Sequence, residues 1–386
     1  MSQPDRAPVL PPLPLHQASA QCGPAGSEWI VGWDIGGAHV KACLVERSRA
    51  QAVVRDACEW ACPLWLGLDH LQRSLALARK RWPQADGAAH ALTMTGEMVD
   101  LFEHREDGVL RLGAALAAGL EGRLRFYAGA EGWCDLAELP LHWASVASAN
   151  WHASADLVAR SIDAGVLVDI GSTTTDLIAV RGARVRMQGQ SDAVRLASGE
   201  LVYHGVVRTP LCALAPRIAH GGRVCNVMNE FFATTADVYR LTAELDPAHD
   251  LQPSADGAAK DALATRRRLA RMIGLDARDA SDADWLAFAH AWRALQLAEI
   301  GGQLQRVIAA AGLPADAPIV GAGCGDFLAV ALAAQLGRPH RRFAALVQGR
   351  DVSTGEGAGD TLERWMQVAA PSVAVALLLA RGMRSA

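Results

Sequence analysis

Two short segments of the chain combine a carboxylate, a glycine and a small-residue turn in the same order. Asp34-Ile35-Gly36-Gly37 follows the apolar run 29–33, and Asp169-Ile170-Gly171-Ser172 follows the apolar run 165–168. Each pattern predicts a buried strand that ends in a glycine-rich hairpin. An acidic residue at such a strand end can hold a cation, while the glycines let backbone N–H groups approach a phosphate. Finding the pattern twice predicts a duplicated domain with a phosphate site between the copies.

The alternative interpretation is a pair of ordinary tight hairpins, because aspartate is common in turns. The matching register of Asp34 and Asp169, together with a third glycine turn at 321–326, favours phosphate or nucleotide binding. We expect the two carboxylates to face each other across a cleft and to hold Mg²⁺ there, with water and phosphate oxygens as further ligands. The phosphate-binding residues expected in the first two turns are Gly36, Gly37, Lys41, Gly171, Ser172, Thr173 and Thr174.

The third turn precedes a predicted helix and adds Gly321 and Gly323 to the expected phosphate site. Backbone amides at a helix N-terminus favour an anion or a close-lying ring. The glycine spacing differs from the Rossmann fingerprint, so a dinucleotide site is not expected. The alternative is a turn that merely lets a strand and a helix pack closely.

Glu97 is the candidate general base. It follows the predicted strand 88–95 and opens a predicted helix over 97–103. A strand end can place a carboxylate at hydrogen-bond distance from a substrate. The sequence leaves open an equally good alternative, in which Thr95 and Glu97 form a helix-capping box.

A basic segment offers further anion ligands. Asp256, Lys260, Arg267 and Arg271 recur at helical spacing, and Asp256 is the only carboxylate on that face. Poorly paired positive charges suit a polyanion such as pyrophosphate, so Lys260 and Arg267 are included in the expected phosphate site. A solvated surface helix is the alternative.

Two segments mix aromatic and polar side chains in a way that suits a ring-binding pocket. The expected pocket residues are Asn150, Trp151, Phe232, Thr234 and Thr235. A core helix with a polar cap would show the same pattern, and the sequence does not separate the two interpretations.

Composition limits the class of protein. The 386 residues carry a net charge of −4, which argues against nucleic-acid binding. No secretory signal is recognised, so reduced cysteines and a cytoplasmic location are expected, and the Cys58/Cys62 pair lacks the partners of a zinc site. The apolar run 372–380 is too short to span a bilayer and is predicted to be a buried terminal helix.

The order of patterns predicts an α/β protein of two domains around a central cleft. Hairpins are expected at 29–46 and 166–180, a helix over 68–82, a turn at 106–108 and mainly helices after 226. The expected division is a disordered or loosely attached tail over 1–28, a first domain over 29–162 plus 366–386, and a second domain with a helical insertion over 163–365.

The glycine turns resemble the phosphate and adenosine loops of the acetate/sugar kinase–Hsp70–actin superfamily. Over roughly residues 29–380 the wider set is similar to one branch, the hydantoinase/oxoprolinase-like family associated with tetrahydromethanopterin-linked one-carbon transfer. The segments that carry this resemblance are Asp34–Lys41, Thr93–Glu97, Ala149–Ser154, Asp169–Asp176, Arg208–Pro210, Phe232–Tyr239 and Arg267–Met272.

The resemblance implies two RNase H-like domains of the actin/Hsp70/sugar-kinase type and a role in methanofuran or methylofuran biosynthesis. The implied reaction joins a furanylmethylamine diphosphate to a γ-glutamyl-tyramine-like or tyrosine-like phenol, forming an ether and releasing pyrophosphate. Mg²⁺ on Asp34 and Asp169 would stabilise the leaving charge, and Glu97 would help to deprotonate the phenol. The partners are then small molecules, with neither nucleic acid nor membrane; a homo-oligomer remains open.

One departure concerns ATP. The first turn carries Gly37-Ala38-His39 where ATP-using members of the superfamily commonly have Thr or Ser and often a basic residue. This argues against ATP hydrolysis more than against phosphate binding. An ATP-dependent amidase or small-molecule kinase is the second hypothesis, and a non-catalytic nucleotide-switch protein is the third.

Overall fold

A computed structural model describes residues 28–348 and 361–383. The predicted tail over 1–28 lies outside the described residues, except for Glu28. Glu28 begins the first strand of a six-stranded sheet of order β3-β2-β1-β4-β5-β6. Its strands are β1 (Glu28–Ile35), β2 (His39–Arg47), β3 (Ala52–Ala61), β4 (Ala89–Met94), β5 (Leu124–Tyr127) and β6 (Trp133–Cys134).

A second sheet repeats this topology. Its main path has the order β10-β8-β7-β13-β14, and β9 pairs with β8. In both sheets the first strand pairs antiparallel with the next strand of its hairpin and parallel with a strand from much later in the sequence. The predicted RNase H-like fold, present twice, is therefore confirmed. The strands are β7 (Ala164–Ile170), β8 (Thr175–Arg181), β9 (Val185–Arg186), β10 (Leu201–Val202), β13 (Ile319–Ala322) and β14 (His340–Arg342).

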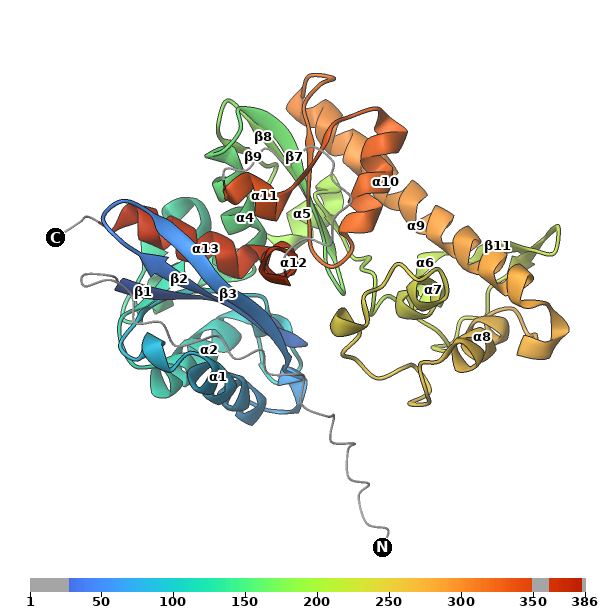
Figure 1. The fold of residues 1–386 in the computed structure, drawn as a ribbon, viewed down its shortest axis with the longest axis horizontal. Coiled ribbons are helices and arrows are strands. Elements are labelled where there is room, and N and C mark those ends of the chain that lie inside the picture. Colours follow the sequence, from blue (N-terminus) through green and yellow to red (C-terminus); the bar gives the residue numbers. More distant parts are fainter. Residues whose placement is uncertain (1–27, 349–360, 384–386) are drawn as a thin grey trace, which may run out of the picture.

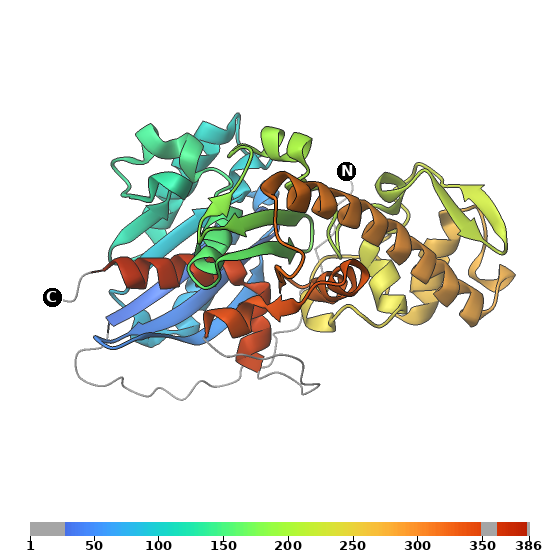
Figure 2. The ribbon, with the colours of Figure 1, turned by 90° about the horizontal axis from the view of Figure 1, so that it is seen from above.

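Two helices lie between the sheets (Figures 1 and 2). α4 (Asn150–Ala159) packs against β7, β8 and α13, and α13 (Ala370–Gly382) packs against β1, β2 and β4. One hydrophobic cluster includes Ile30 of the first sheet, Leu167 of the second and Val373 of α13. The opposite side of β1 packs Val31 and Trp33 into a separate cluster with α1 and α2. The predicted buried terminal helix is thus confirmed as a link between the sheets.

The other helices of the two sheet regions are mostly short. They are α1 (Asp69–Arg81), α2 (Arg105–Gly119), α3 (Leu139–Val146), α5 (Asp192–Ser198), α10 (Asp326–Leu336), α11 (Phe343–Val347) and α12 (Thr361–Val368). Short 3-10 helices cover Leu64–Leu66, Pro83–Ala85, Gly96–Met98, Gly129–Glu131, Pro247–His249 and Ala277–Asp279. α12 runs across the expected domain boundary at 365/366, and the domain boundaries stay predictions.

A mainly helical insertion between β10 and β13 projects away from both sheets (Figure 1). The long helix α9 connects it to the second sheet, because its N-terminal half buries Trp285 and Trp292, its C-terminal half buries Val307, and the helix packs against β8. The elements of the insertion are α6 (Leu211–Leu214), β11 (Arg217–His220), β12 (Arg223–Asn226), α7 (Thr235–Leu241), α8 (Ala262–Arg271) and α9 (Asp282–Ala311).

The sequence prediction around Glu97 is wrong in its secondary structure. The predicted helix over 97–103 is only the 3-10 turn Gly96–Met98, and the predicted turn at 106–108 lies inside α2. The His104 side chain accepts a hydrogen bond from the backbone of Asp107 at 3.1 Å and so caps α2. Gly108 is needed inside this helix because a side chain there would overlap the backbone of Glu97.

No single helix among residues 28–348 and 361–383 is long and apolar enough to cross a membrane. α12 and α13 satisfy the length and composition test only as a pair, and they are bent by 93° at their junction.

The contact between β1 and α13 makes a stability prediction. A Cβ at Gly32 would overlap the carbonyl oxygen of Ser372, so Gly32→Ala should lower the free energy of unfolding by about 2 kcal/mol. Gly302→Ala is the matched control, because Gly302 lies in α9 with open space around it and should gain about 0.5–1 kcal/mol in helix propensity. Urea unfolding measures both values. Equal effects of the two substitutions would contradict the packing shown here.

Candidate functional site

A cavity of about 480 Å³ opens between the two hairpin loops. Both loops contribute carboxylates, glycines and hydroxyl groups to its wall. The lining residues expected from the sequence are Asp34, Gly36, Gly37, Lys41, Asn150, Asp169, Gly171, Ser172, Thr173 and Thr174. The structure therefore brings most of the predicted site together.

The two hairpin turns are closed by the same backbone hydrogen bond. Gly36 donates its N–H to the carbonyl oxygen of His39, and Gly171 donates to that of Thr174, each at 2.9 Å. In the β1–β2 pair Asp34 lies opposite Lys41, whereas in the β7–β8 pair Asp169 lies opposite Asp176. The duplication thus places a lysine in one hairpin and a third carboxylate in the other at equivalent positions.

The two expected metal ligands are buried carboxylates. Burial is the main cause that raises the pKa of Asp34 to about 6 and that of Asp169 to about 7. Burial alone would lower the pKa of Lys41, but Glu59 and Asp34 raise it above its ordinary value. The site therefore holds a persistent positive charge beside two carboxylates that ionise only near neutral pH.

Asp34 and Asp169 suit a divalent cation that takes its other ligands from water and phosphate. Asp34 Oδ1 is buried and has no hydrogen-bond partner in the described part of the chain. Among those same residues no group of three or more His, Cys, Asp or Glu side chains is placed to hold a metal. Two carboxylates plus water and phosphate oxygens is the arrangement that Mg²⁺ commonly takes at phosphate sites.

The second loop is held in place by the segment 204–208. Val206 and Val207 donate backbone hydrogen bonds to Gly171 and Ser172, and Thr175 Oγ1 donates to the carbonyl oxygen of His204 at 2.7 Å. A side chain at Gly205 would overlap the backbone of Thr173, which explains the glycine there. The loop is therefore fixed before any ligand binds.

Arg208 and Trp65 belong to the cleft although sequence reasoning gave them no role. Arg208 Nη1 donates to Thr173 Oγ1 at 3.3 Å, and its guanidinium lies 5.6 Å from the centre of the Trp65 ring. Arg208 thus adds a second cation near the hydroxyl groups of the second loop. The only sequence signal was the Arg208-Thr-Pro210 segment, because the contact with Trp65 joins residues far apart in the chain.

A buried ion pair supports the wall beside Asp169. Arg195 is 1% exposed and donates to Asp176 at 2.5 Å. Its guanidinium lies 4.1 Å from the centre of the Trp151 ring. Trp151 was expected in the substrate pocket, but it is buried behind Arg195, and its neighbour Asn150 lines the cleft instead.

Glu97 lies directly behind the wall of the cleft. Its side chain is buried, and its Oε1 accepts a hydrogen bond from Ser148 Oγ at 2.7 Å. Burial raises the pKa of Glu97 to about 7, within the range of a general base. Thr95 makes no side-chain capping bond, so the helix-capping alternative is not supported.

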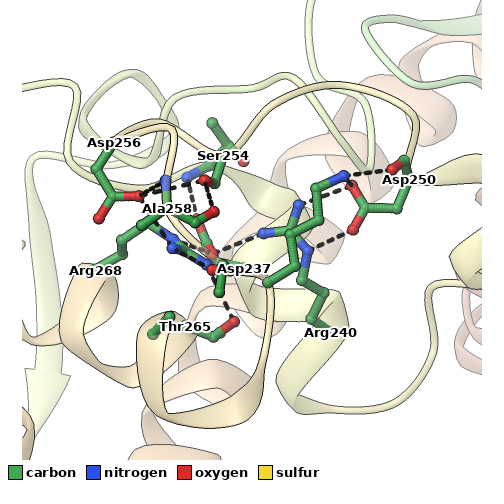
Figure 3. Close-up of polar contacts among 12 residues, drawn as sticks. Asp237, Arg240, Asp250, Ser254, Asp256, Ala258, Thr265 and Arg268 are labelled. Atoms are coloured by element: carbon green, nitrogen blue, oxygen red, sulfur yellow. Dashed lines mark hydrogen bonds and ion pairs between the residues drawn. The ribbon is translucent and has the colours of Figure 1, made fainter. Parts of the chain in front are cut away.

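The expectation of a poorly paired basic face at 256–271 is wrong (Figure 3). Arg268 is fully buried and contacts Asp237 at 2.7 Å and Asp256 at 3.1 Å. Lys260 contacts Asp250 at 3.0 Å. These partners come from α7 and the following loop, beyond the reach of a helical pattern. Lys260 and Arg267 are not among the lining residues of the cleft, and we leave them out of the proposed site.

The residues around α7 that were expected in a ring-binding pocket instead stabilise the fold. Thr234 and Asp237 form a capping box, and Thr235 Oγ1 donates to the carbonyl oxygen of Gly205 at 2.8 Å. Phe232 packs against the core of the second sheet. None of Phe232, Thr234 and Thr235 is among the residues that line the cleft, so the core-helix interpretation fits them better.

The third glycine turn packs against the end of β7. A side chain at Gly323, where φ is 82°, would overlap the carbonyl oxygen of Ile170 and lie 2.6 Å from Asp169 Oδ1. One at Gly321 would overlap Asp326. The turn therefore lets β13 approach the Asp169 carboxylate closely, as the strand–helix packing alternative expects, and neither glycine lines the cleft.

Sequence comparison identifies the family. The Hydantoinase/oxoprolinase family model matches residues 89–348, which is more than half of the chain. The chain belongs to the hydantoinase/oxoprolinase family. The match begins with the first residue of β4, so it includes Glu97 and the Asp169 hairpin but not the Asp34 hairpin.

Two curated relatives of this hydantoinase/oxoprolinase protein share one name, (4-{4-[2-(gamma-L-glutamylamino)ethyl]phenoxymethyl}furan-2-yl)methanamine synthase. The protein of Methanocaldococcus jannaschii is 29% identical over 262 residues, which cover 68% of this chain and 76% of that protein. The protein of Methanococcus vannielii is 32% identical over 123 residues, so this chain spans 55% of its length and the match covers 32% of this chain. Nucleotide-free acetone carboxylase is a structural neighbour with a TM-score of 0.49, 10% identity and coverage of 81% of this chain and 68% of that one.

The charge distribution predicts which lysine binds an anion. Lys41→Met should weaken the binding of pyrophosphate by about tenfold or more, because it removes a buried cation from the cleft. Lys260→Met should leave the affinity unchanged, because Lys260 is held by Asp250 outside the cleft. Isothermal titration calorimetry with Mg²⁺ present measures both constants. A loss of affinity in Lys260→Met with none in Lys41→Met would refute this assignment.

Proposed function

We propose that this protein condenses a furanylmethylamine diphosphate with the phenol of a γ-glutamyl-tyramine-like or tyrosine-like compound. The product is an aryl ether on the path to a methanofuran or methylofuran coenzyme, and pyrophosphate is released. The observation that carries the proposal is the cleft itself, where two phosphate-type hairpin loops enclose Asp34, Asp169 and Lys41. The shared name of the two curated relatives supports this choice of reaction.

The cleft has the groups needed to bind a diphosphate. Lys41 and Arg208 supply positive charge, while Ser172, Thr173 and Thr174 supply hydroxyl and backbone donors. Asp34 and Asp169 would hold Mg²⁺, which when bound neutralises charge on the diphosphate oxygens. These interactions strengthen as the leaving group gains charge, which is what a transition-state stabiliser requires.

The reaction balances without ATP. The bond between the furfuryl carbon and the diphosphate oxygen breaks, and its electron pair leaves with the diphosphate. The phenol oxygen forms the new bond to that carbon, and its proton is taken by a base, for which Glu97 is the candidate. A phenol has a pKa near 10, so removal of this proton in the site assists the attack at neutral pH.

The turn Gly37-Ala38-His39 of the first hairpin has no Thr, Ser, Lys or Arg side chain to bind an ATP phosphate. His39 is buried, and its Nε2 lies 3.0 Å from Gln252 Nε2 and its Nδ1 lies 3.5 Å from Glu59. Burial lowers the pKa of His39, which disfavours the charged form of the ring. This favours a diphosphate carried by the substrate over a nucleotide. The competing function, suggested by the family name, is an ATP-dependent amidase.

A direct assay tests the proposal. Purified protein, Mg²⁺, furanylmethylamine diphosphate and γ-glutamyltyramine are mixed without ATP, and pyrophosphate and the ether are quantified by coupled assay and mass spectrometry. We expect equal amounts of the two products, and a loss of about a hundredfold or more in Asp169→Asn. Asp282→Asn is the control, because this side chain is 84% exposed in the insertion and should not affect the rate.

Absence of the ether together with ATP turnover that depends on an amide or alcohol substrate would overturn this proposal in favour of the amidase or kinase.

A further inference from the structure

Ser148 has an unusual backbone in the wall of the cleft. It joins α3 to α4 and adopts a φ of 53°, the left-handed region that non-glycine residues rarely occupy. Of the described non-glycine residues only Ala183 and Ala243 share this feature. Such a conformation costs of order 1 kcal/mol and persists only where the surrounding structure enforces it. Here it places Ser148, which is 5% exposed, among the residues that line the cleft.

The Ser148 hydroxyl connects the cleft to buried acid groups. Ser148 Oγ lies 2.7 Å from Glu97 Oε1, 3.1 Å from Asp192 Oδ2 and 3.3 Å from Arg105 Nη2. A hydroxyl has one hydrogen to donate, and Glu97 is the nearer acceptor. Arg105 donates to one lone pair of the Ser148 oxygen, and the other lone pair is able to accept a hydrogen bond from a ligand in the cleft.

Ser148 connects Glu97 to the cleft. The side chain of Glu97 is 0% exposed, and Glu97 is not among the lining residues, whereas Ser148 is. The second carboxylate oxygen, Oε2, is buried without a hydrogen-bond partner in the described part of the chain. A substrate in the cleft therefore meets Ser148 and not the Glu97 carboxylate, whose Oε2 has a free site for a proton.

The charges around Glu97 favour the uptake of one proton. The Arg105 guanidinium lies 3.7 Å from Glu97 and 3.9 Å from Asp192. Asp192 also lies 3.7 Å from the guanidinium of Arg195, which is paired with Asp176. The three carboxylates and two guanidinium groups together leave one negative charge in a largely buried cluster, and one added proton removes it. Burial raises the pKa of Glu97. The hydrogen bond from Ser148 and the charge of Arg105 lower this pKa, while the charge of Asp192 raises it, and the resulting value is about 7.

We propose that Ser148 is the group that contacts the phenol, and that it passes the phenol proton to Glu97. This inference rests on the proposed function. The phenol O–H donates to Ser148 Oγ, the Ser148 hydrogen moves to Glu97, and the phenolate oxygen attacks the furfuryl carbon as diphosphate departs. Glu97 then returns its proton through Ser148 to the solvent, which restores the starting state. Ser148 is the catalytic residue in contact with substrate, and Glu97 accepts the proton behind it.

The test uses Ser148→Gly, because glycine removes the hydroxyl and also accepts the positive φ without strain. We expect kcat to fall by about a hundredfold while KM changes little. Ala183→Gly is the matched control, since it relaxes the same backbone conformation in an exposed turn after β8 and should keep the wild-type kcat. Thermal unfolding of all three proteins shows whether each folds.

Two readouts separate proton transfer from a structural role. In the wild type kcat/KM should rise with pH to a plateau above about 7, where Glu97 is ionised, whereas in Ser148→Gly it should continue to rise toward the phenol pKa near 10. A substrate analogue with a nitrophenol group, already ionised at pH 8, should restore most of the rate of the glycine variant.

The outcomes are distinct. A wild-type protein that makes no ether overturns the proposed function and this inference with it. A wild type that makes the ether, with Ser148→Gly within twofold of its kcat or with an equal defect on the nitrophenol, overturns the role of Ser148 alone.

Discussion

The structure depends on one constraint: two buried carboxylates and one lysine lie together where two hairpins meet. Asp34 and Asp169 occupy equivalent positions in two copies of one sheet topology, so the duplication brings both carboxylates to the same cleft. Burial opposes their ionisation, and Lys41 offsets part of that cost. The copies differ where Lys41 in one hairpin corresponds to Asp176 in the other, and the Asp176 charge is paired by Arg195, which also lines the cleft. A cation and a bound diphosphate would complete the balance of charge in the cleft.

The charged side chains of the helical insertion form ion pairs that stabilise the fold. In the insertion Asp237 pairs with Arg240 and Arg268, and Asp250 pairs with Arg240 and Lys260 (Figure 3). These groups satisfy one another and leave little charge for a ligand. Asp34 Oδ1 in the wall of the cleft and Glu97 Oε2 behind that wall are buried without hydrogen-bond partners among the described residues. Unsatisfied buried polar atoms are costly, so a cation at Asp34 and a proton on Glu97 would each remove part of that cost.

Local patterns predicted much of the fold, and contacts between distant segments explain the failures. The hairpins, the helix α1 and the terminal helix follow from apolar periodicity and glycine turns, which depend only on neighbouring residues. The anion role given to Lys260 failed because Asp250 approaches it from another loop. Glu97 was predicted as a base from its place after a strand, and that role stays a prediction. Its burial behind Ser148 could not be predicted, because it depends on a left-handed residue between α3 and α4. Arg208 and Trp65 were missed for the same reason, since they meet only across the cleft.

The central claim is that the cleft holds a diphosphate as the leaving group of the substrate and that the phenol oxygen is the nucleophile. The most direct measurement follows ¹⁸O placed in the phenol hydroxyl through one turnover, with the ether and the released phosphate compounds analysed by mass spectrometry. The account predicts that all of the label remains in the ether and none enters pyrophosphate or phosphate. Label found in a phosphate product would show that the phenol oxygen had been phosphorylated and lost, and would contradict the mechanism.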